Sequence, residues 1–262
     1  MPADSVLPDA LELIPEGFTM LAFPSGLQAD IRDTIVAYIL SFDKETKSDH
    51  NADHLRDVVC AMGDDEFVSN FKKGFRTFPD VLAARLLPWV DSEIRTRLNA
   101  NQITLTYVSE ADRKTNASLS PKSYDVYWRI VRPNKPDVAG PHIDATFADL
   151  NVGSERAIPL PFDFTSRWRI WMPLMGCTSE NSLQFIPGSQ NEHFPATSRD
   201  TPYGPRPSVS EEWKQANEHR FVCPFTEFDG QCVLFSDKVV HRGPVNGEQG
   251  LRISAELTVI VR

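Results

Sequence analysis

The sequence lacks the features of a membrane protein and of a nucleic-acid-binding protein. No apolar run approaches the roughly 20 residues that a membrane-spanning helix needs, and the first residues lack the basic and apolar stretches of a signal peptide. Lys and Arg total 27 against 36 Asp and Glu, so the net charge of −9 has the wrong sign for neutralising nucleic-acid phosphates. We therefore expect a cytoplasmic protein without a nucleic-acid or membrane partner.

Cysteine and glycine are also scarce. The four cysteines include no C-x-x-C pair, which excludes the usual zinc and disulfide patterns. The 13 glycines are outnumbered by 20 prolines, many of them between residues 133 and 224, which predicts long, stiff connections there. Hydrophobic residues make up 41% of the 262 residues and charged residues 24%, as in an ordinary soluble globular protein.

Residues 1–100 are predicted to be mainly helical. Apolar residues recur at helical spacing between Gln28 and Leu40, between Leu55 and Met62, and between Pro79 and Leu98. Gly63 follows the second of these segments, as expected at a helix end. The helices are amphipathic, so each needs a partner surface for its apolar side.

Residues 101–262 are predicted to be mainly β-strands. β-Branched and aromatic residues dominate short segments bounded by Gly, Pro, Asn or Asp. The predicted strands are Tyr124–Val131, Trp168–Leu174, Ser182–Ile186, Gln231–Phe235 and Leu251–Val261. Because these strands do not alternate with helices, we expect an antiparallel sandwich or barrel that shares one core with the N-terminal helices, in a single domain over residues 1–262.

An H-x-D pair, His142 and Asp144, follows a Gly-Pro turn, and His241 lies far downstream. Two imidazoles and one carboxylate form the facial triad of non-haem Fe(II) sites. Residues two apart on a strand point to the same side, so both side chains can bind one metal ion. Alone the pair is weak evidence, because a His two residues from an Asp is often only a surface hydrogen bond.

Arg252 and Ser254 add a second signal. Arg252 lies 11 residues after His241, and Ser254 follows on the same side of the predicted last strand. A guanidinium and a hydroxyl together can bind a carboxylate by charge-assisted hydrogen bonds. That carboxylate would belong to a 2-oxo acid that chelates the iron.

With these residues the chain resembles the Fe(II)/2-oxoglutarate-dependent dioxygenases, and among them the phytanoyl-CoA-hydroxylase-like group. The segment Glu180–Gln190 is similar to that group's E-N-G-x-L-x-x-x-P-G-S-H motif, with Ser182 in place of Gly and Gln190 in place of His. The resemblance covers Tyr124 to Val261. The two departures affect loop contacts and leave the metal ligands intact.

The resemblance implies a double-stranded β-helix, or jelly roll, with helices packed outside one sheet. It implies Fe(II), 2-oxoglutarate and O2 as cofactor and cosubstrates, with Arg252 and Ser254 at the far carboxylate of 2-oxoglutarate. Decarboxylation of 2-oxoglutarate to succinate accompanies oxidation of an unactivated C–H bond. Related halogenases replace the Asp of the triad by a small residue, so Asp144 favours hydroxylation.

Side chains on the strand before the H-x-D pair are further candidates. Tyr127 and Arg129 are predicted to share one side of that strand and Trp128 and Ile130 the other. By resemblance, we assign Arg129 to 2-oxoglutarate and Tyr127 to the substrate. A solvent-facing Arg129 is the alternative.

Three more residues are assigned to the substrate: Arg169, Trp171 and Asn181. For Trp171, packing in the core is the alternative. The segments Asn181–Gln190 and Ala145–Arg167 are expected to cover the site. His50 and His54 stand four apart and can be drawn as a second metal site, but a solvated polar helix side is the preferred interpretation.

We therefore expect an oxygenase that hydroxylates a small metabolite or natural-product intermediate. The alternatives are a desaturase or cyclising oxidase on the same iron site, and a metal-binding jelly roll that acts as a sensor without turnover. The sequence leaves the substrate open, as well as the choice between monomer and homodimer.

Overall fold

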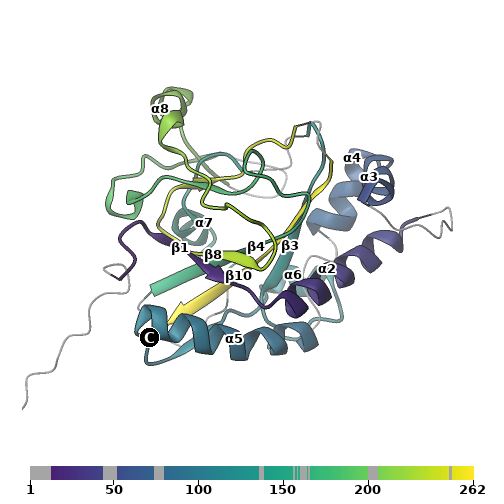
Figure 1. Ribbon diagram of the computed structural model, residues 1–262, viewed down its shortest axis with the longest axis horizontal. Coiled ribbons are helices and arrows are strands. Elements are labelled where there is room, and N and C mark those ends of the chain that lie inside the picture. Colours follow the sequence, from purple (N-terminus) through teal and green to yellow (C-terminus); the bar gives the residue numbers. More distant parts are fainter. Residues whose placement is uncertain are drawn as a thin grey trace, which may run out of the picture.

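A six-stranded antiparallel sheet forms the centre of the computed structural model, with helices along one side (Figure 1). The structure describes residues 13–43, 52–73, 80–135, 139–155, 166–199, 206–247 and 250–262, and the single residues 157, 159 and 164. The helices on that side include α2 (Ser25–Leu40) and α5 (Asp80–Leu98), and α7 (Asp144–Leu150) lies on the other side.

The central sheet combines strands that are distant in the sequence. Its order is β1 (Phe18–Ala22), β8 (Gln231–Ser236), β4 (Ser166–Met175) and β10 (Arg252–Val261). The far edge of β10 pairs with β3 (Val126–Val131) and, near its end, with β2 (Ile103–Leu105). Two short antiparallel pairs complete the strands: β5 (Gln184–Phe185) with β9 (His241–Arg242), and β6 (Thr197–Arg199) with β7 (Arg206–Ser208).

The remaining elements are short. They are α3 (Ala52–Cys60), α4 (Asp64–Phe67), a π-helix (Val68–Lys73), α6 (Glu110–Thr115), α8 (Glu211–Asn217) and two 3-10 turns (Ser189–Asn191 and Glu218–Arg220). Among the described residues, no helix has both the length and the apolar character that a bilayer span requires.

The two faces of the sheet differ in chemistry because side chains alternate along each strand. On β10, Ile253, Ala255, Leu257 and Val259 point toward the helices and join the main core. We call this the helix face. It packs against apolar stripes of α2 and α5 that include Ile31, Ile35, Leu86 and Ile94.

The opposite side of the sheet, here called the site face, is partly polar. On β10 it carries Arg252, Ser254, Glu256 and Thr258, all of them buried. Next to these residues a smaller apolar cluster fills the space between β8, β4 and the β5/β9 pair: Phe18, Trp171, Phe185, Phe225, Val233, Phe235 and Val239.

The predicted fold class, a mainly β jelly roll with flanking helices, is confirmed. All the predicted strands are present, although β5 is shorter than Ser182–Ile186. One strand, β1, falls in the part predicted to be mainly helical, because its pairing with β8 is a contact between distant parts of the sequence. The segment predicted as a loop from Ala145 onward begins with helix α7.

Candidate metal centre

His142, Asp144 and His241 come together on the site face, as the sequence predicts. The ligand atoms of the three side chains all lie within 4.8 Å of one another, and among the described residues they form the one such group of three. His142 and His241 form an antiparallel bridge in which each backbone N–H donates to the other's carbonyl oxygen at 3.0 Å. Residues 99 positions apart are thereby fixed side by side.

The prediction that His142 and Asp144 lie on one strand is wrong for Asp144. Ile143 is the last extended residue, and Asp144 is the first residue of α7. The Ala145 backbone N–H donates to the Asp237 carbonyl oxygen at 2.9 Å, which ties this first turn to the loop after β8. The carboxylate still reaches the two imidazoles, but by a turn of the chain rather than by strand alternation.

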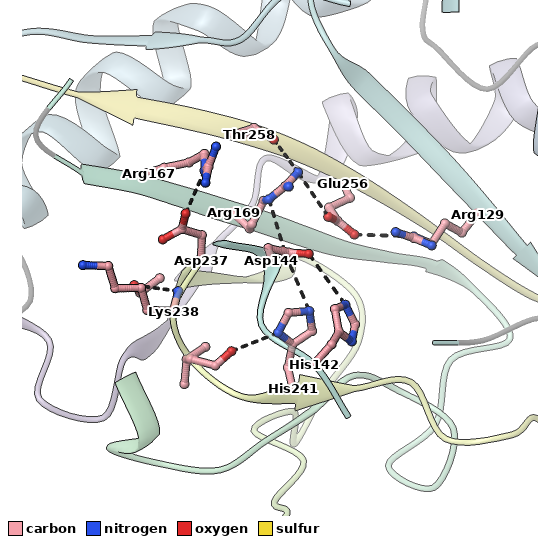
Figure 2. Close-up of polar contacts among 12 residues, drawn as sticks. Arg129, His142, Asp144, Arg167, Arg169, Asp237, Lys238, His241, Glu256 and Thr258 are labelled. Atoms are coloured by element: carbon pink, nitrogen blue, oxygen red, sulfur yellow. Dashed lines mark hydrogen bonds and ion pairs between the residues drawn. The ribbon is translucent and has the colours of Figure 1, made fainter. Parts of the chain in front are cut away.

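Both histidines present the same nitrogen to the site. Nδ1 of His142 lies 2.7 Å from the Gly140 carbonyl oxygen, and Nδ1 of His241 lies 3.1 Å from the Val239 carbonyl oxygen. Because a carbonyl can only accept, each Nδ1 carries the proton and each Nε2 keeps its lone pair. The Nε2 atoms lie 3.6 and 3.7 Å from the Asp144 carboxylate (Figure 2).

The surroundings of His241 keep it neutral. The rings of Phe235 and Phe185 lie with centroids 4.9 and 6.0 Å from the imidazole. Burial, together with the nearby His142, lowers the pKa of His241 to about 3. A neutral imidazole is the form that binds a metal ion.

Asp144 is held by a buried cation. Arg169 Nε lies 3.2 Å from Asp144 Oδ2, and the Arg169 side chain is only 3% exposed. Burial raises the pKa of the Asp144 carboxyl, but the opposing effects of Arg169, His241 and His142 are larger in sum, and the pKa falls well below the ordinary value. The donor set is thus two imidazoles and one carboxylate, which fits Fe(II).

A second polar group lies further along β10. Arg252 donates through Nη1 to the Asn181 carbonyl oxygen. Among the described residues, neither Arg252 Nε nor the Ser254 hydroxyl has a hydrogen-bond partner, although both are buried. Burial lowers the pKa of Arg252 to about 10. A buried guanidinium and hydroxyl without partners fit the far carboxylate of 2-oxoglutarate.

Arg129 is the exposed residue of β3. The other five residues of that strand are buried, and Tyr127 and Arg129 share the site face as predicted. Arg129 Nη2 donates to the Tyr127 hydroxyl at 3.4 Å, and its Nε lies 3.6 Å from Glu256 Oε2. The Tyr127 hydroxyl itself donates to Glu256. Arg129 is therefore exposed to solvent, while its guanidinium contacts the buried side chains of Tyr127 and Glu256.

Three residues assigned to the substrate have other contacts. Arg169 forms a buried ion pair with Asp144, although its Nε has no hydrogen-bond partner among the described residues. Trp171 is 2% exposed and packs in the apolar cluster, its ring centroid 5.3 Å from that of Phe225. The Asn181 carboxamide accepts from the Thr178 N–H at 2.8 Å and donates to the Gly176 carbonyl and the Asn246 side chain, so it orders the turn that contacts Arg252.

The segment Glu180–Gln190 supports His241. Its strand β5 pairs with β9, with Phe185 opposite His241. Gly188 adopts a left-handed conformation (φ 75°), and the Ser189 hydroxyl accepts from the Val240 N–H at 2.9 Å. This framework role was not part of the prediction of a covering loop.

The second histidine pair has a different structure from the predicted one. His54 is 9% exposed, and its Nε2 lies 2.8 Å from Asp43 Oδ2, so this side of α3 is not solvated there. His50 lies outside the described residues.

Glu256 and Thr258 were missed by the sequence analysis. Both contact Arg169: Thr258 accepts a hydrogen bond from its Nη1, and Glu256 Oε1 lies 3.6 Å from the same atom. The signal was available, because strand alternation continues from Arg252 and Ser254 to residues 256 and 258.

A jelly roll that carries a two-histidine, one-carboxylate centre and a buried arginine on its last strand defines the class of Fe(II)- and 2-oxoglutarate-dependent oxygenases. A family model described as phytanoyl-CoA dioxygenase (PhyH) matches residues 40–254, and the chain belongs to this family. The predicted family, enzyme class and cofactors are confirmed. No curated protein sequence matches significantly.

Several solved structures share the fold. EctD from S. alaskensis with 2-oxoglutarate and 5-hydroxyectoine is 15% identical with a TM-score of 0.52, over 96% of this chain and 74% of that chain. ThoJ, a non-heme monooxygenase in its apo form, is 15% identical with a TM-score of 0.52, over 97% of this chain and 77% of that chain. The epimerase SnoN with Fe3+, alpha ketoglutarate and nogalamycin RO is 14% identical with a TM-score of 0.50, over 94% of this chain and 80% of that chain.

Proposed function

We propose that this oxygenase hydroxylates an unactivated C–H bond of a small metabolite or natural-product intermediate. The observation that carries the proposal is the complete triad: Asp144 is present, ionised and within 3.7 Å of both imidazole Nε2 atoms. With a carboxylate as third ligand, the protein itself supplies three of six octahedral positions. The other three are then left for 2-oxoglutarate and O2.

His142, Asp144 and His241 are the residues that would hold iron. When bound, the iron supplies the coordination of 2-oxoglutarate and O2 and the oxidising power for C–H cleavage. The residues themselves fix the geometry: the Gly140 and Val239 carbonyls orient the two imidazoles, and Arg169 orients the carboxylate. Phe185 and Phe235 exclude water from one side of His241.

Arg252 and Ser254 are the residues that we assign to the far carboxylate of 2-oxoglutarate. The free Arg252 Nε and the free Ser254 hydroxyl are two donors on one strand face, and binding an anion there removes the cost of burying them without partners. Arg129 lies opposite Ser254 on β3. We assign it to 2-oxoglutarate as well, with Tyr127 next to it toward the substrate.

Small-molecule substrates fit what the structural neighbours contain. EctD was solved with 5-hydroxyectoine and SnoN with nogalamycin RO. The neighbours also include a monooxygenase and an epimerase, so the fold accommodates different outcomes at a related site. For this chain the retained carboxylate favours hydroxylation.

The test is a product analysis. The Fe(II)-loaded protein is incubated with 2-oxoglutarate, O2 and a pooled metabolite extract, and succinate release and product masses are recorded. Hydroxylation is supported by succinate release with a product that has gained one oxygen atom. A product that has lost two hydrogens instead shows a desaturase or cyclising oxidase. Metal binding without succinate release under any condition shows a sensor.

A further inference from the structure

Arg169 is a buried cation whose contacts converge on an iron ligand. It lies in the middle of β4, on the site face, and is 3% exposed. Its Nε lies 3.2 Å from Asp144 Oδ2, while its Nη1 donates to the Thr258 hydroxyl and lies 3.6 Å from Glu256 Oε1 (Figure 2). The guanidinium thus bridges the metal ligand on α7 and two residues of β10.

The other contacts of Asp144 do not fix its side chain. The residue begins α7 directly after extended backbone, and the imidazole nitrogens nearest its carboxylate are 3.6 and 3.7 Å away, beyond hydrogen-bond distance. Arg169 provides the nearest charged partner, and Arg169 is itself anchored on the rigid central sheet by Thr258. The Nε–Oδ2 contact is an ion pair without hydrogen-bond geometry, and it is the shortest charged contact of this carboxylate among the described residues, so we infer that the orientation of Asp144 depends on the position of Arg169.

We propose that Arg169 is a positioning residue for the iron centre: it holds one oxygen of Asp144 so that the other faces His142 and the metal. The proposal rests on the proposed function, because it requires that the triad binds iron. It replaces the substrate contact predicted from the sequence. Loss of a residue that orients a metal ligand typically lowers the metal affinity by about 10- to 100-fold.

Arg167 supplies a matched control. It lies two residues before Arg169 on the same side of β4, has a side chain that is 10% exposed, and pairs with a buried carboxylate, with Nε 2.7 Å from Asp237 Oδ2. Asp237 is not one of the three metal ligands, and it contacts the first turn of α7 through its backbone carbonyl rather than through its carboxylate. Substitution of Arg167 thus removes a neighbouring ion pair of β4 without removing the contact between Arg169 and Asp144.

The experiment measures binding of Co(II), as a stable substitute for Fe(II), by its visible absorption in the metal-free protein without 2-oxoglutarate. Arg169→Gln is expected to weaken Co(II) binding about 10- to 100-fold and to change the absorption bands. Arg169→Lys keeps the positive charge, but a single ammonium group cannot contact Asp144 and Thr258 as the planar guanidinium does. Its Co(II) affinity should therefore lie between those of Arg169→Gln and the wild type. Arg167→Gln should keep wild-type affinity and spectrum even if its stability to urea falls as much.

Thr258→Val provides a milder change if Arg169→Gln does not fold. It removes one anchor of the guanidinium at nearly constant volume, and a smaller loss of Co(II) affinity is expected. Unchanged affinity and spectrum in the folded Arg169 variants, or in Thr258→Val when these do not fold, would overturn the positioning role. An equal loss in Arg167→Gln would do the same. Failure of the wild-type protein to bind Co(II) would instead overturn the proposed metal site.

Discussion

The two faces of the central sheet carry the same strands but opposite chemistry. Along β10, Ile253, Ala255 and Leu257 pack against the helices, while Arg252, Ser254 and Glu256 alternate with them on the site face. Both rows are buried, yet only the second contains polar atoms without partners among the described residues. The apolar row stabilises the fold by its burial. Buried polar atoms without hydrogen-bond partners are uncommon in folded proteins, so those on the site face indicate a place where a ligand binds.

Arg169 and Arg252 differ in the charges that surround them on the site face. Arg169 has a carboxylate, a hydroxyl and a second carboxylate around it, and its pKa is raised because the summed effects of Asp144, Tyr127, Glu256 and Asp125 outweigh the opposing effect of burial. Arg252 has a single carbonyl acceptor, and burial lowers its pKa. Each guanidinium has an Nε without a hydrogen bond among the described residues, but Arg169 already pairs with carboxylates, whereas Arg252 has only a carbonyl partner and can bind an anion.

The largest expected effect breaks the metal centre that the site face supports. Asp144→Ala removes the anionic ligand and should lower succinate release by more than about 100-fold, beyond the range for residues that only orient a ligand. Far-ultraviolet circular dichroism should show an intact fold. Turnover within about tenfold of wild type, as expected for a residue that only orients a ligand, would exclude Asp144 as a ligand.

The next largest effect is expected from a substitution that disturbs the packing of the helix face. Leu257 is fully buried in the main core, opposite Ile170 of β4 and Val126 of β3. Leu257→Ala should lower the free energy of unfolding in urea by about 2–5 kcal/mol, because it removes buried methyl groups and leaves a cavity. The KM for 2-oxoglutarate of the folded fraction should stay at the wild-type value. A raised KM would show that the two faces are not independent.

Arg252→Ala tests the opposite face of the same strand, five residues before Leu257 on β10. Loss of hydrogen bonds to a charged group, about 1.5–3 kcal/mol, corresponds to a KM for 2-oxoglutarate raised about 10- to 100-fold. Co(II) affinity without 2-oxoglutarate should change little, since Arg252 does not contact the triad. If the KM for 2-oxoglutarate is unchanged, the assignment of Arg252 is wrong.

Arg129→Gln is expected to act more weakly, because Arg129 is 43% exposed. The KM for 2-oxoglutarate should rise by about threefold to tenfold, as for one partly solvated charge-assisted contact. The measurement separates the assignment to 2-oxoglutarate from the alternative stated in the sequence analysis, a solvent-facing Arg129. If no KM changes, Arg129 faces solvent without a binding role.

The sequence was sufficient for the features that depend on local periodicity. Strand alternation placed Tyr127 and Arg129 on one face and Trp128 and Ile130 on the other, and the structure agrees. The spacing of apolar residues located α2 and α5 to within a few residues. These signals are local because each element buries one side of its own segment.

Features that depend on distant contacts could not be predicted in this way. β1 is a strand because Phe18–Ala22 pairs with β8, more than 200 residues later. The role of Arg169 depends on Asp144, which approaches it through the turn into α7 rather than along a strand. The residues around Arg169 in the sequence give no sign of Asp144, and those around Asp144 give no sign of Arg169. Strand alternation therefore predicted the correct face for Arg169 but not its contact with Asp144.

The smallest predicted effect distinguishes the two faces most directly. Ser254→Ala removes a buried hydroxyl that has no partner among the described residues, so the free energy of unfolding should stay the same or rise slightly. Binding of 2-oxoglutarate loses one hydrogen bond, about 0.5–1.5 kcal/mol, and its KM should rise about twofold to tenfold. Urea unfolding and succinate assays on the same preparation check both signs. A loss of stability without a change in KM would mean that Ser254 belongs to the structure, as Leu257 does, and not to the ligand.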